Sequence, residues 1–309
     1  MSLDPEIQVL INGMAEGDTP PLHELAPEEA RALYTAMSQM LDTVDVPIGQ
    51  VEDRTVGEGV PVRIYSPVAG SGVLPVLVFF HGGGWVIGDL NSHDTLCRSL
   101  ANQAHCRVVA VDYRLSPEHK FPAGLDDAYS VLEWVEQHAG EIDVDPNRIA
   151  VGGDSAGGNL AAVLSLKARD EKGPSIAFQL LIYPVTDHTA EDGSREEFAE
   201  GYFLAQETML WFSEQYMKPD DDWQAPYASP LMAENFANLP PAYVVTAGYD
   251  ILRDEGKAYA DALSSANVDV VHKNYSGMIH GFFNMQSVSK VSVQAVQEAA
   301  LALEKAFSV

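Results

Sequence analysis

A short stretch near the middle of the chain constrains the fold more than any other. Residues 148–160 read R-I-A-V-G-G-D-S-A-G-G-N-L. The apolar, β-favouring run Ile149–Val151 predicts a strand that is buried on both faces of a parallel sheet. Gly153–Gly157 then fits G-x-S-x-G, a tight strand-to-helix turn that exposes a serine hydroxyl at a helix N-terminus. The stretch therefore indicates that Ser155 is a nucleophile.

Two other kinds of glycine-rich turn can be tested against the same residues. A dinucleotide fingerprint, G-x-G-x-x-G, fails because Asp154 or Ser155 stands where the second glycine is required. A phosphate-binding loop counted from Gly152 meets Gly158 and Asn159 where it needs Lys and then Ser or Thr. Neither kind of nucleotide site is predicted here.

A second glycine-rich loop follows another predicted buried strand. Residues 74–80 are apolar throughout and lead directly into H-G-G-G-W at residues 81–85. Consecutive glycines allow a backbone to approach a ligand closely and to turn its N–H groups inward. A flexible turn is the alternative interpretation. The position after a buried strand and upstream of G-x-S-x-G favours an oxyanion hole.

Strands alternate with helices along most of the chain, which predicts an α/β fold with a mainly parallel central sheet and helices on both faces. The expected strands are 48–56, 60–65, 74–80, 107–113, 149–151, 176–183, 242–247 and 268–275. The expected helices of this domain are 121–138, 159–168, 254–266 and 291–307. The first two strands are predicted to pair antiparallel at a sheet edge.

Two helical regions interrupt this alternation. Residues 1–45 hold two predicted helices, from Asp4 to about Asp42, and residues 185–230 form an insertion with an aromatic-rich helix. The predicted catalytic domain is therefore 46–184 together with 231–309. The two helical regions are candidates for the halves of a lid.

Several large apolar side chains are candidates for a substrate pocket. Those in the insertion fit the core of a lid and the wall of a pocket equally well, and two more lie near the glycine-rich loop and the last predicted loop. The candidates are Trp85, Leu204, Met209, Phe212 and Phe282.

A nucleophilic serine needs a general base, and the base needs a carboxylate that fixes its tautomer. With G-x-S-x-G the expected chain order is serine, then an acid, then histidine. His272 falls inside a predicted strand, whereas His280 follows the last strand and is the predicted base. Asp250 stands just past a strand end and is the predicted acid, with Asp254 as the second choice.

The overall charge limits the partners of the chain. Its 309 residues include 45 acidic and 18 basic side chains, a formal net charge of −27, which argues against nucleic acid and anionic membranes. No apolar run is long enough to insert into a bilayer, and the first residues lack the basic start of a secretory signal. We expect a cytoplasmic monomer or homodimer that acts on a small neutral molecule.

The two cysteines show no metal-ligand spacing. Cys97 and Cys106 are predicted to be free buried thiols, and neither a metal nor a cofactor is expected.

Taken together, five stretches resemble the hormone-sensitive-lipase family (family IV) of bacterial carboxylesterases, within the α/β-hydrolases. The stretches are 81–85, 113–123, 152–160, 250–255 and 280–282. The resemblance implies an α/β-hydrolase fold whose cap is built from the two helical regions. It also implies a catalytic triad of Ser155, Asp250 and His280 and an oxyanion hole formed by the N–H groups of Gly83, Gly84 and Ala156.

The activity implied by the resemblance is hydrolysis of short- to medium-chain acyl esters through an acyl-enzyme. The same triad suits an amidase or an acyltransferase equally well. A non-catalytic receptor is another alternative, because plant gibberellin receptors resemble this family but lack the catalytic histidine. The presence of His280 favours an enzyme.

Overall fold

Eight strands form one sheet in the order β1-β2-β4-β3-β5-β6-β7-β8, in a computed structural model that describes residues 2–17, 19–41, 43–70, 72–191 and 193–308. β1 (Gln50–Val56) pairs antiparallel with β2 (Val60–Ser66) at one edge, which confirms that prediction. β2 also runs antiparallel to its other neighbour, and all the remaining pairs are parallel. Those strands are β3 (Leu74–Phe80), β4 (Arg107–Val111), β5 (Val144–Asp154), β6 (Phe178–Ile182), β7 (Ala242–Tyr249) and β8 (Val270–Ile279).

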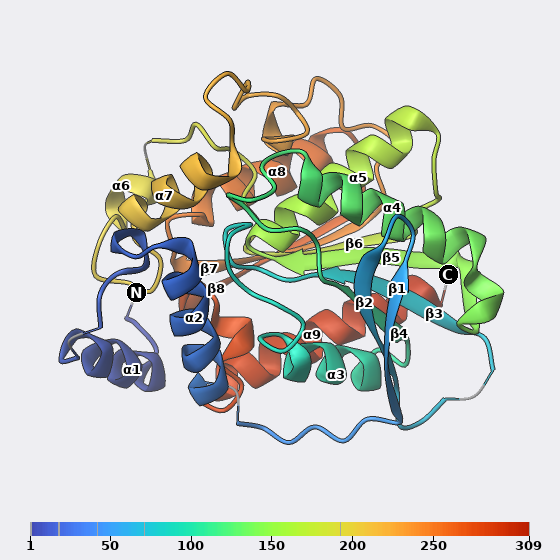
Figure 1. Cartoon of the computed structure of the whole chain (residues 1–309), viewed down its shortest axis with the longest axis horizontal. Coiled ribbons are helices and arrows are strands. Elements are labelled where there is room, and N and C mark those ends of the chain that lie inside the picture. The colour runs from blue at the N-terminus through green and yellow to red at the C-terminus, as the bar shows by residue number, and fades with distance from the viewer. Residues whose placement is uncertain (1, 18, 42, 71, 192, 309) are drawn as a thin grey trace.

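Helices cover both faces of the sheet, as predicted (Figure 1). One face carries α3 (Asp94–Gln103) and α9 (Lys290–Phe307). The other carries α4 (Ala123–Gln137), α5 (Ala156–Glu171) and α8 (Arg253–Ser265). The sequence predicts all of these helices except α3.

The central strand β3 shows why its sequence is apolar throughout. Val76, Val78 and Phe80 join the core beneath α4, α5 and α8, whereas Leu77 and Phe79 join the core beneath α3 and α9. Successive side chains of a strand point to opposite faces, so a strand covered on both sides needs apolar residues at every position. The two cores together hold the strand ends in place, and the candidate site lies at those ends.

The two helical regions outside the sheet framework hold the remaining helices. The N-terminal region contains α1 (Pro5–Ala15), the 3₁₀ turn η1 (Leu22–Glu24) and α2 (Pro27–Leu41). The insertion contains α6 (Ser194–Glu197) and α7 (Gln206–Tyr216), and both regions lie on the same side of the molecule (Figure 1). Further 3₁₀ turns are η2 (Ala139–Glu141), η3 (Pro230–Met232) and η4 (Phe282–Asn284).

The first helix, α1, begins directly after its capping residue, Asp4. The carboxylate of Asp4 accepts a hydrogen bond from the N–H of Glu6 at 2.9 Å, which satisfies a free donor of the first turn of α1. Asp42, where the predicted helical pattern ends, lies outside the described residues.

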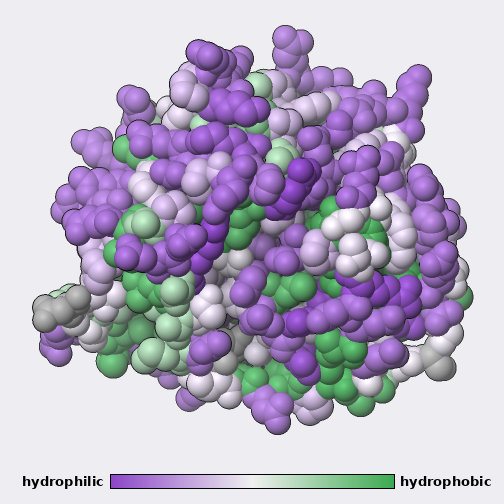
Figure 2. Space-filling model, viewed as in Figure 1, coloured by the Kyte–Doolittle hydropathy of each residue, from purple (hydrophilic) through white to green (hydrophobic). Residues whose placement is uncertain are grey.

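The surface of the molecule is largely hydrophilic. The face in Figure 2 is mostly hydrophilic, with apolar residues confined to small patches. Within the described ranges, no helix combines the length and the apolar character needed to cross a bilayer. Cys97 and Cys106 are buried free thiols, as predicted.

Candidate active site

Ser155 sits at the turn between β5 and α5, in a backbone conformation that few residues adopt. Its φ of 54° and ψ of −118° lie in a sparsely populated region, where strain is kept only when the surroundings enforce it. Here the N–H of Ser155 is held by the carbonyl of Ile182 at 2.9 Å. Gly157 is required by close approach, because a Cβ at that position would lie 1.9 Å from the carbonyl oxygen of Phe80. The turn holds the serine at the ends of the parallel strands.

The structure brings Ser155, His280 and Asp250 into one line of hydrogen bonds. The Oγ of Ser155 lies 2.9 Å from Nε2 of His280, and Nδ1 of His280 lies 2.8 Å from Oδ2 of Asp250. The histidine follows β8 directly and the aspartate follows β7, as predicted. Because a carboxylate can only accept, Nδ1 carries the proton, which leaves Nε2 free to accept the serine proton.

The site is shielded from water. Ser155 is 8% exposed, His280 7% and Asp250 2%. The second oxygen of Asp250 accepts the N–H of Leu252 at 2.9 Å, so both carboxylate oxygens are engaged. The aromatic ring of Tyr183 packs against the imidazole, with ring centroids 4.7 Å apart. Hydrogen bonds in such a water-poor environment are stronger than in solution.

The loop after β3 places backbone donors beside the serine turn. Gly84 has a φ of 57°, and a Cβ there would lie 2.2 Å from the Phe212 ring, so only glycine fits. Within the described part of the chain, the N–H groups of Gly83, Gly84 and Ala156 donate to no protein acceptor. Ala156 is also the first residue of α5, where the partial positive charge of a helix N-terminus gathers.

The glycine loop is tied to the serine turn by Asp154, a residue to which the sequence alone assigns no function. Its Oδ1 accepts the N–H of Gly82 at 2.9 Å and lies 3.0 Å from Nε2 of His93. Asn284 reaches the other oxygen at 3.3 Å. The position of Asp154 inside G-x-S-x-G is a signal that could have identified it, whereas His93 has no local sequence signal.

The surroundings of Asp154 change its acidity. Burial alone would raise its pKa, but the nearby His93 and the N–H of Gly82 outweigh that effect, and the pKa lies below the usual value. The ionised form therefore stabilises the fold above the unfolded carboxyl pKa of about 3.9. This contribution is lost as the pH falls through the lower pKa of the folded state.

We expect Asp154→Asn to lower the free energy of unfolding by about 1–3 kcal/mol at neutral pH, because charge-assisted hydrogen bonds are lost. We also expect kcat to fall about ten- to hundredfold, because the loop that carries Gly83 and Gly84 loses its tether. Urea unfolding at neutral and acidic pH, with ester turnover, measures both. The stability difference should shrink below about pH 4.

Asp127→Asn is the matched control for this variant. Asp127 is a carboxylate of α4 that is 5% exposed and accepts the N–H of Arg114 at 2.8 Å, and its hydrogen bonds to described residues go to Arg114 and not to the glycine loop. Its loss should reduce stability while kcat stays within about twofold, because Asp127 does not tether the glycine loop. Equal losses of kcat in both variants would contradict the tether.

The predicted pocket residues fall on two sides of the sheet. Phe212 contacts Gly84, and Leu204, Met209 and Trp85 belong to the same core cluster as Phe212. Trp85 is only 1% exposed, with its ring stacked on Tyr216 at 4.3 Å. Trp85 is therefore a core residue next to the glycine loop.

The assignment of Phe282 to the substrate pocket must be corrected. It is fully buried in the other core cluster, where its ring packs against Tyr183 at 5.7 Å and Tyr275 at 5.2 Å. Gly281 adopts a φ of 79°, and the 3₁₀ turn that follows directs Phe282 into the core. It forms no wall of a pocket.

No group of three or more His, Cys, Asp or Glu side chains is placed to hold a metal ion within the ranges that the structure describes. The site consists of a serine, a histidine, a carboxylate and backbone donors.

Fold and site together define a hydrolase of the α/β class. The sequence profile of the family described as "alpha/beta hydrolase fold" matches residues 77–284, a span that contains the glycine loop and all three of Ser155, Asp250 and His280. The chain belongs to this family, in its hormone-sensitive-lipase-like branch (family IV). The resemblance inferred from the sequence is confirmed.

Individual relatives match over nearly the whole chain. The carboxylic ester hydrolase LipN of Mycobacterium tuberculosis is 40% identical, over 98% of this chain and 82% of its own length. The carboxylesterase NlhH of the same species is 38% identical, over 98% and 96% respectively. The crystal structure of a thermostable esterase from Pseudomonas putida ECU1011 superposes with a TM-score of 0.96 at 39% identity, covering 100% of this chain and 98% of that one.

Proposed function

We propose that the protein is a serine carboxylesterase that hydrolyses short- to medium-chain acyl esters through an acyl-enzyme. One observation carries the proposal. The hydroxyl of Ser155, the imidazole of His280 and the carboxylate of Asp250 are joined by contacts of 2.9 and 2.8 Å. Relatives named as carboxylic ester hydrolases and carboxylesterases support the ester as substrate.

The first half of the proposed reaction transfers the acyl group to the enzyme. Ser155 Oγ attacks the ester carbonyl carbon while Nε2 of His280 takes the hydroxyl proton. The carbonyl oxygen becomes an oxyanion against the N–H groups of Gly83, Gly84 and Ala156, each of which contributes about 2.7–4 kcal/mol to the transition state. The C–O bond to the alcohol then breaks, and the imidazolium returns the proton to the leaving oxygen.

The second half regenerates the enzyme with water. His280 takes a proton from the water as its oxygen attacks the acyl carbon, and the same N–H groups receive the oxyanion. Collapse releases the carboxylic acid, and the proton returns to Ser155 Oγ. Asp250 stays ionised throughout and stabilises the imidazolium that forms in each half.

We further propose that residues 1–45 and 185–230 together form a cap over this site, on a catalytic domain of 46–184 and 231–309. Contacts between the two cap segments support this division. Nδ1 of His23 in η1 lies 2.9 Å from the Thr208 hydroxyl in α7, and Nε2 of His23 lies 3.1 Å from the Glu207 carboxylate. A cap closed in this way limits the length of acyl chain that the site accepts.

The chain-length preference tests the proposed substrate class. With p-nitrophenyl esters from acetyl to palmitoyl, kcat/KM should be highest between butanoyl and octanoyl. Each buried methylene contributes about 0.8 kcal/mol until the pocket is full. A maximum at dodecanoyl or longer would mean an open pocket, and faster turnover of the matching anilides would favour an amidase.

Shortening one cap side chain should move the optimum. Phe212 lies against Gly84, so Phe212→Ala is expected to shift the best substrate toward longer acyl chains. Leu210→Ala is the matched control, because Leu210 belongs to the same helix but is 46% exposed. An identical chain-length profile for wild type and Phe212→Ala would place the acyl pocket elsewhere.

A further inference from the structure

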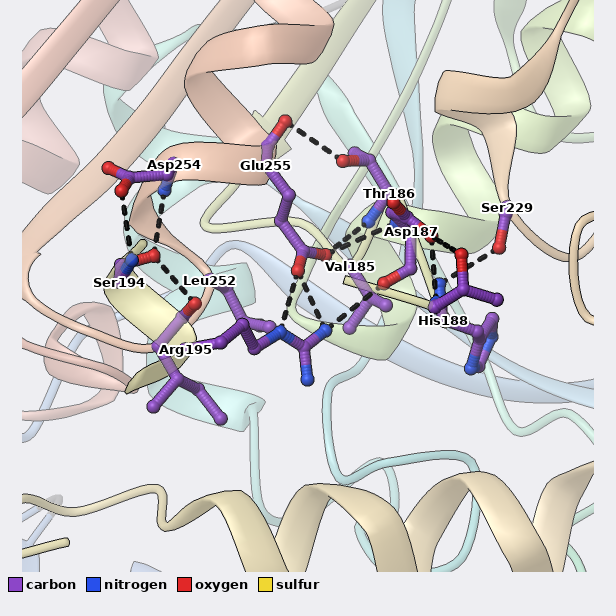
Figure 3. A network of polar contacts seen from close by, with 12 residues as sticks. Val185, Thr186, Asp187, His188, Ser194, Arg195, Ser229, Leu252, Asp254 and Glu255 are labelled. Atoms are coloured by element: carbon purple, nitrogen blue, oxygen red, sulfur yellow. Dashed lines mark hydrogen bonds and ion pairs between the residues drawn. The ribbon is translucent and has the colours of Figure 1, made fainter. Parts of the chain in front are cut away.

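A short helix in the insertion is bonded to the segment that carries the acid of the proposed triad. The segment 250–255 follows β7 and includes the first turn of α8, and α6 lies against it (Figure 3). The hydroxyl of Ser194 donates to the carbonyl of Ile251 at 2.8 Å and accepts the N–H of Asp254 at 3.1 Å. The N–H of Ser194 also donates to the Asp254 carboxylate at 2.9 Å. One residue of α6 therefore makes three bonds to this segment.

A buried ion pair reinforces the same contact. The side chains of Arg195 and Glu255 are 4% and 3% exposed, and two guanidinium nitrogens approach one carboxylate oxygen at 2.7 and 2.9 Å. The other oxygen accepts the N–H groups of Thr186 at 2.8 Å and of Asp187 at 3.3 Å (Figure 3). Losing one partner of such a pair leaves a buried charge uncompensated. The pair therefore fixes α6 against the first turn of α8.

The anchored segment determines where the carboxylate of Asp250 lies. Its Oδ1 accepts the N–H of Leu252 at 2.9 Å, and its Oδ2 faces Nδ1 of His280 at 2.8 Å. The bonds from α6 are made to Ile251, Asp254 and Glu255, close to Asp250 in the chain. A movement of this backbone is therefore transmitted to the carboxylate that orients the imidazole.

We propose that Ser194 and Arg195 are positioning residues for Asp250. The inference rests on the proposed function, in which Asp250 holds His280 in the tautomer that accepts the serine proton. Both positioning residues belong to the insertion, outside the strand-and-helix framework that carries the proposed triad. Turnover thus depends on α6 staying docked against the 250–255 segment.

The most direct test is Ser194→Ala, which removes one hydroxyl and leaves the ion pair intact. We expect kcat for p-nitrophenyl butanoate to fall about tenfold or more, since a small misplacement of a catalytic group is costly. KM should stay within about threefold, because Ser194 bonds to the 250–255 segment, which positions Asp250 but does not bind the ester. Inactivation by diethyl p-nitrophenyl phosphate should slow by the same factor as kcat.

A spectroscopic measurement decides the inference without relying on turnover. The Nδ1 proton of His280 faces a carboxylate at 2.8 Å and should give a far-downfield proton resonance, identified by its absence in His280→Ala. In Ser194→Ala we expect this resonance to shift upfield or to broaden. If the wild type hydrolyses no ester, the proposed function fails, while this comparison still tests the positioning of Asp250.

Ser165→Ala is the matched control, since Ser165 is a buried serine whose hydroxyl donates to the Ala161 carbonyl at 3.0 Å within α5. It should retain the wild-type resonance and kcat. Arg195→Lys is a second variant, which keeps the positive charge but loses the two-nitrogen contact, and it should change both readouts in the same direction. A Ser194→Ala protein that melts earlier but keeps the wild-type resonance and kcat would overturn the inference.

Discussion

Replacing Ser155 with alanine is expected to lower kcat for ester hydrolysis by about 10⁴-fold or more, because in the proposed mechanism the Ser155 hydroxyl forms the acyl-enzyme. The fold should be unaffected. Among the residues that the structure describes, the side chain of Ser155 hydrogen-bonds only to His280, and alanine tolerates a φ of 54° no worse than serine does. The free energy of unfolding should stay within about 0.5 kcal/mol of the wild type.

Covalent labelling provides the complementary measurement. Diethyl p-nitrophenyl phosphate should modify Ser155 alone, as read by peptide mass spectrometry, and should leave Ser155→Ala unmodified. The Ser165→Ala protein, whose substitution lies in α5, the helix that follows the serine turn, should be labelled and should hydrolyse ester like the wild type. Labelling at another serine, or turnover near the wild-type rate in Ser155→Ala, would show that the nucleophile is a different residue.

Asp250→Asn is expected to lower kcat by about 10⁴-fold with little change in the fold. An amide can present its NH₂ group to Nδ1 of His280, which moves the ring proton to Nε2. That nitrogen can then no longer accept the serine proton. Steady-state kinetics at neutral pH, together with circular dichroism, measure the loss of turnover and the retention of the fold.

Asp254→Asn tests which of two carboxylates is the acid, since the sequence predicts Asp250 with Asp254 as the second choice. The carboxylate of Asp254 accepts from Ser194 and Arg253 and makes no contact with His280. Its replacement should lower kcat by no more than about tenfold, through a slight displacement of the 250–255 segment. A larger loss in Asp254→Asn than in Asp250→Asn would reverse the assignment.

Most of the sheet could be predicted because the signals for its strands lie within short stretches of the sequence. β3 matches its predicted bounds, since an unbroken apolar run of seven residues suits a strand covered on both faces. β1 and β2 were recognised as an antiparallel edge pair. α3 was not predicted: it is short and has no side-chain cap at its start, and Leu96 and Leu100 become a core face only beside α9.

Phe282 shows the limit of inference from neighbouring residues in the chain. It stands two residues after His280, and this proximity in sequence led to its assignment as a pocket residue. The backbone turns at Gly281 and directs the ring into the opposite core, against Tyr183 and Tyr275. A turn can separate close sequence neighbours, and sequence distance does not record the direction of that turn.

By itself the sequence determined the features that depend on backbone sterics and strand-to-helix order. These are the strained turn at Ser155, the glycine loop at 82–84 and the placement of Asp250 and His280 just after successive strands. Each follows from a few adjacent residues, because allowed dihedral angles and side-chain periodicity are local properties.

Only the tertiary structure decided which distant groups meet. Asp154 reaches back to Gly82, and Arg195 pairs with Glu255 across 60 positions of the chain. A carboxylate in a sequence has many possible partners of opposite charge. Burial selects among them, because a charge removed from water must find a partner within hydrogen-bonding distance and only the packed fold determines which groups lie that close.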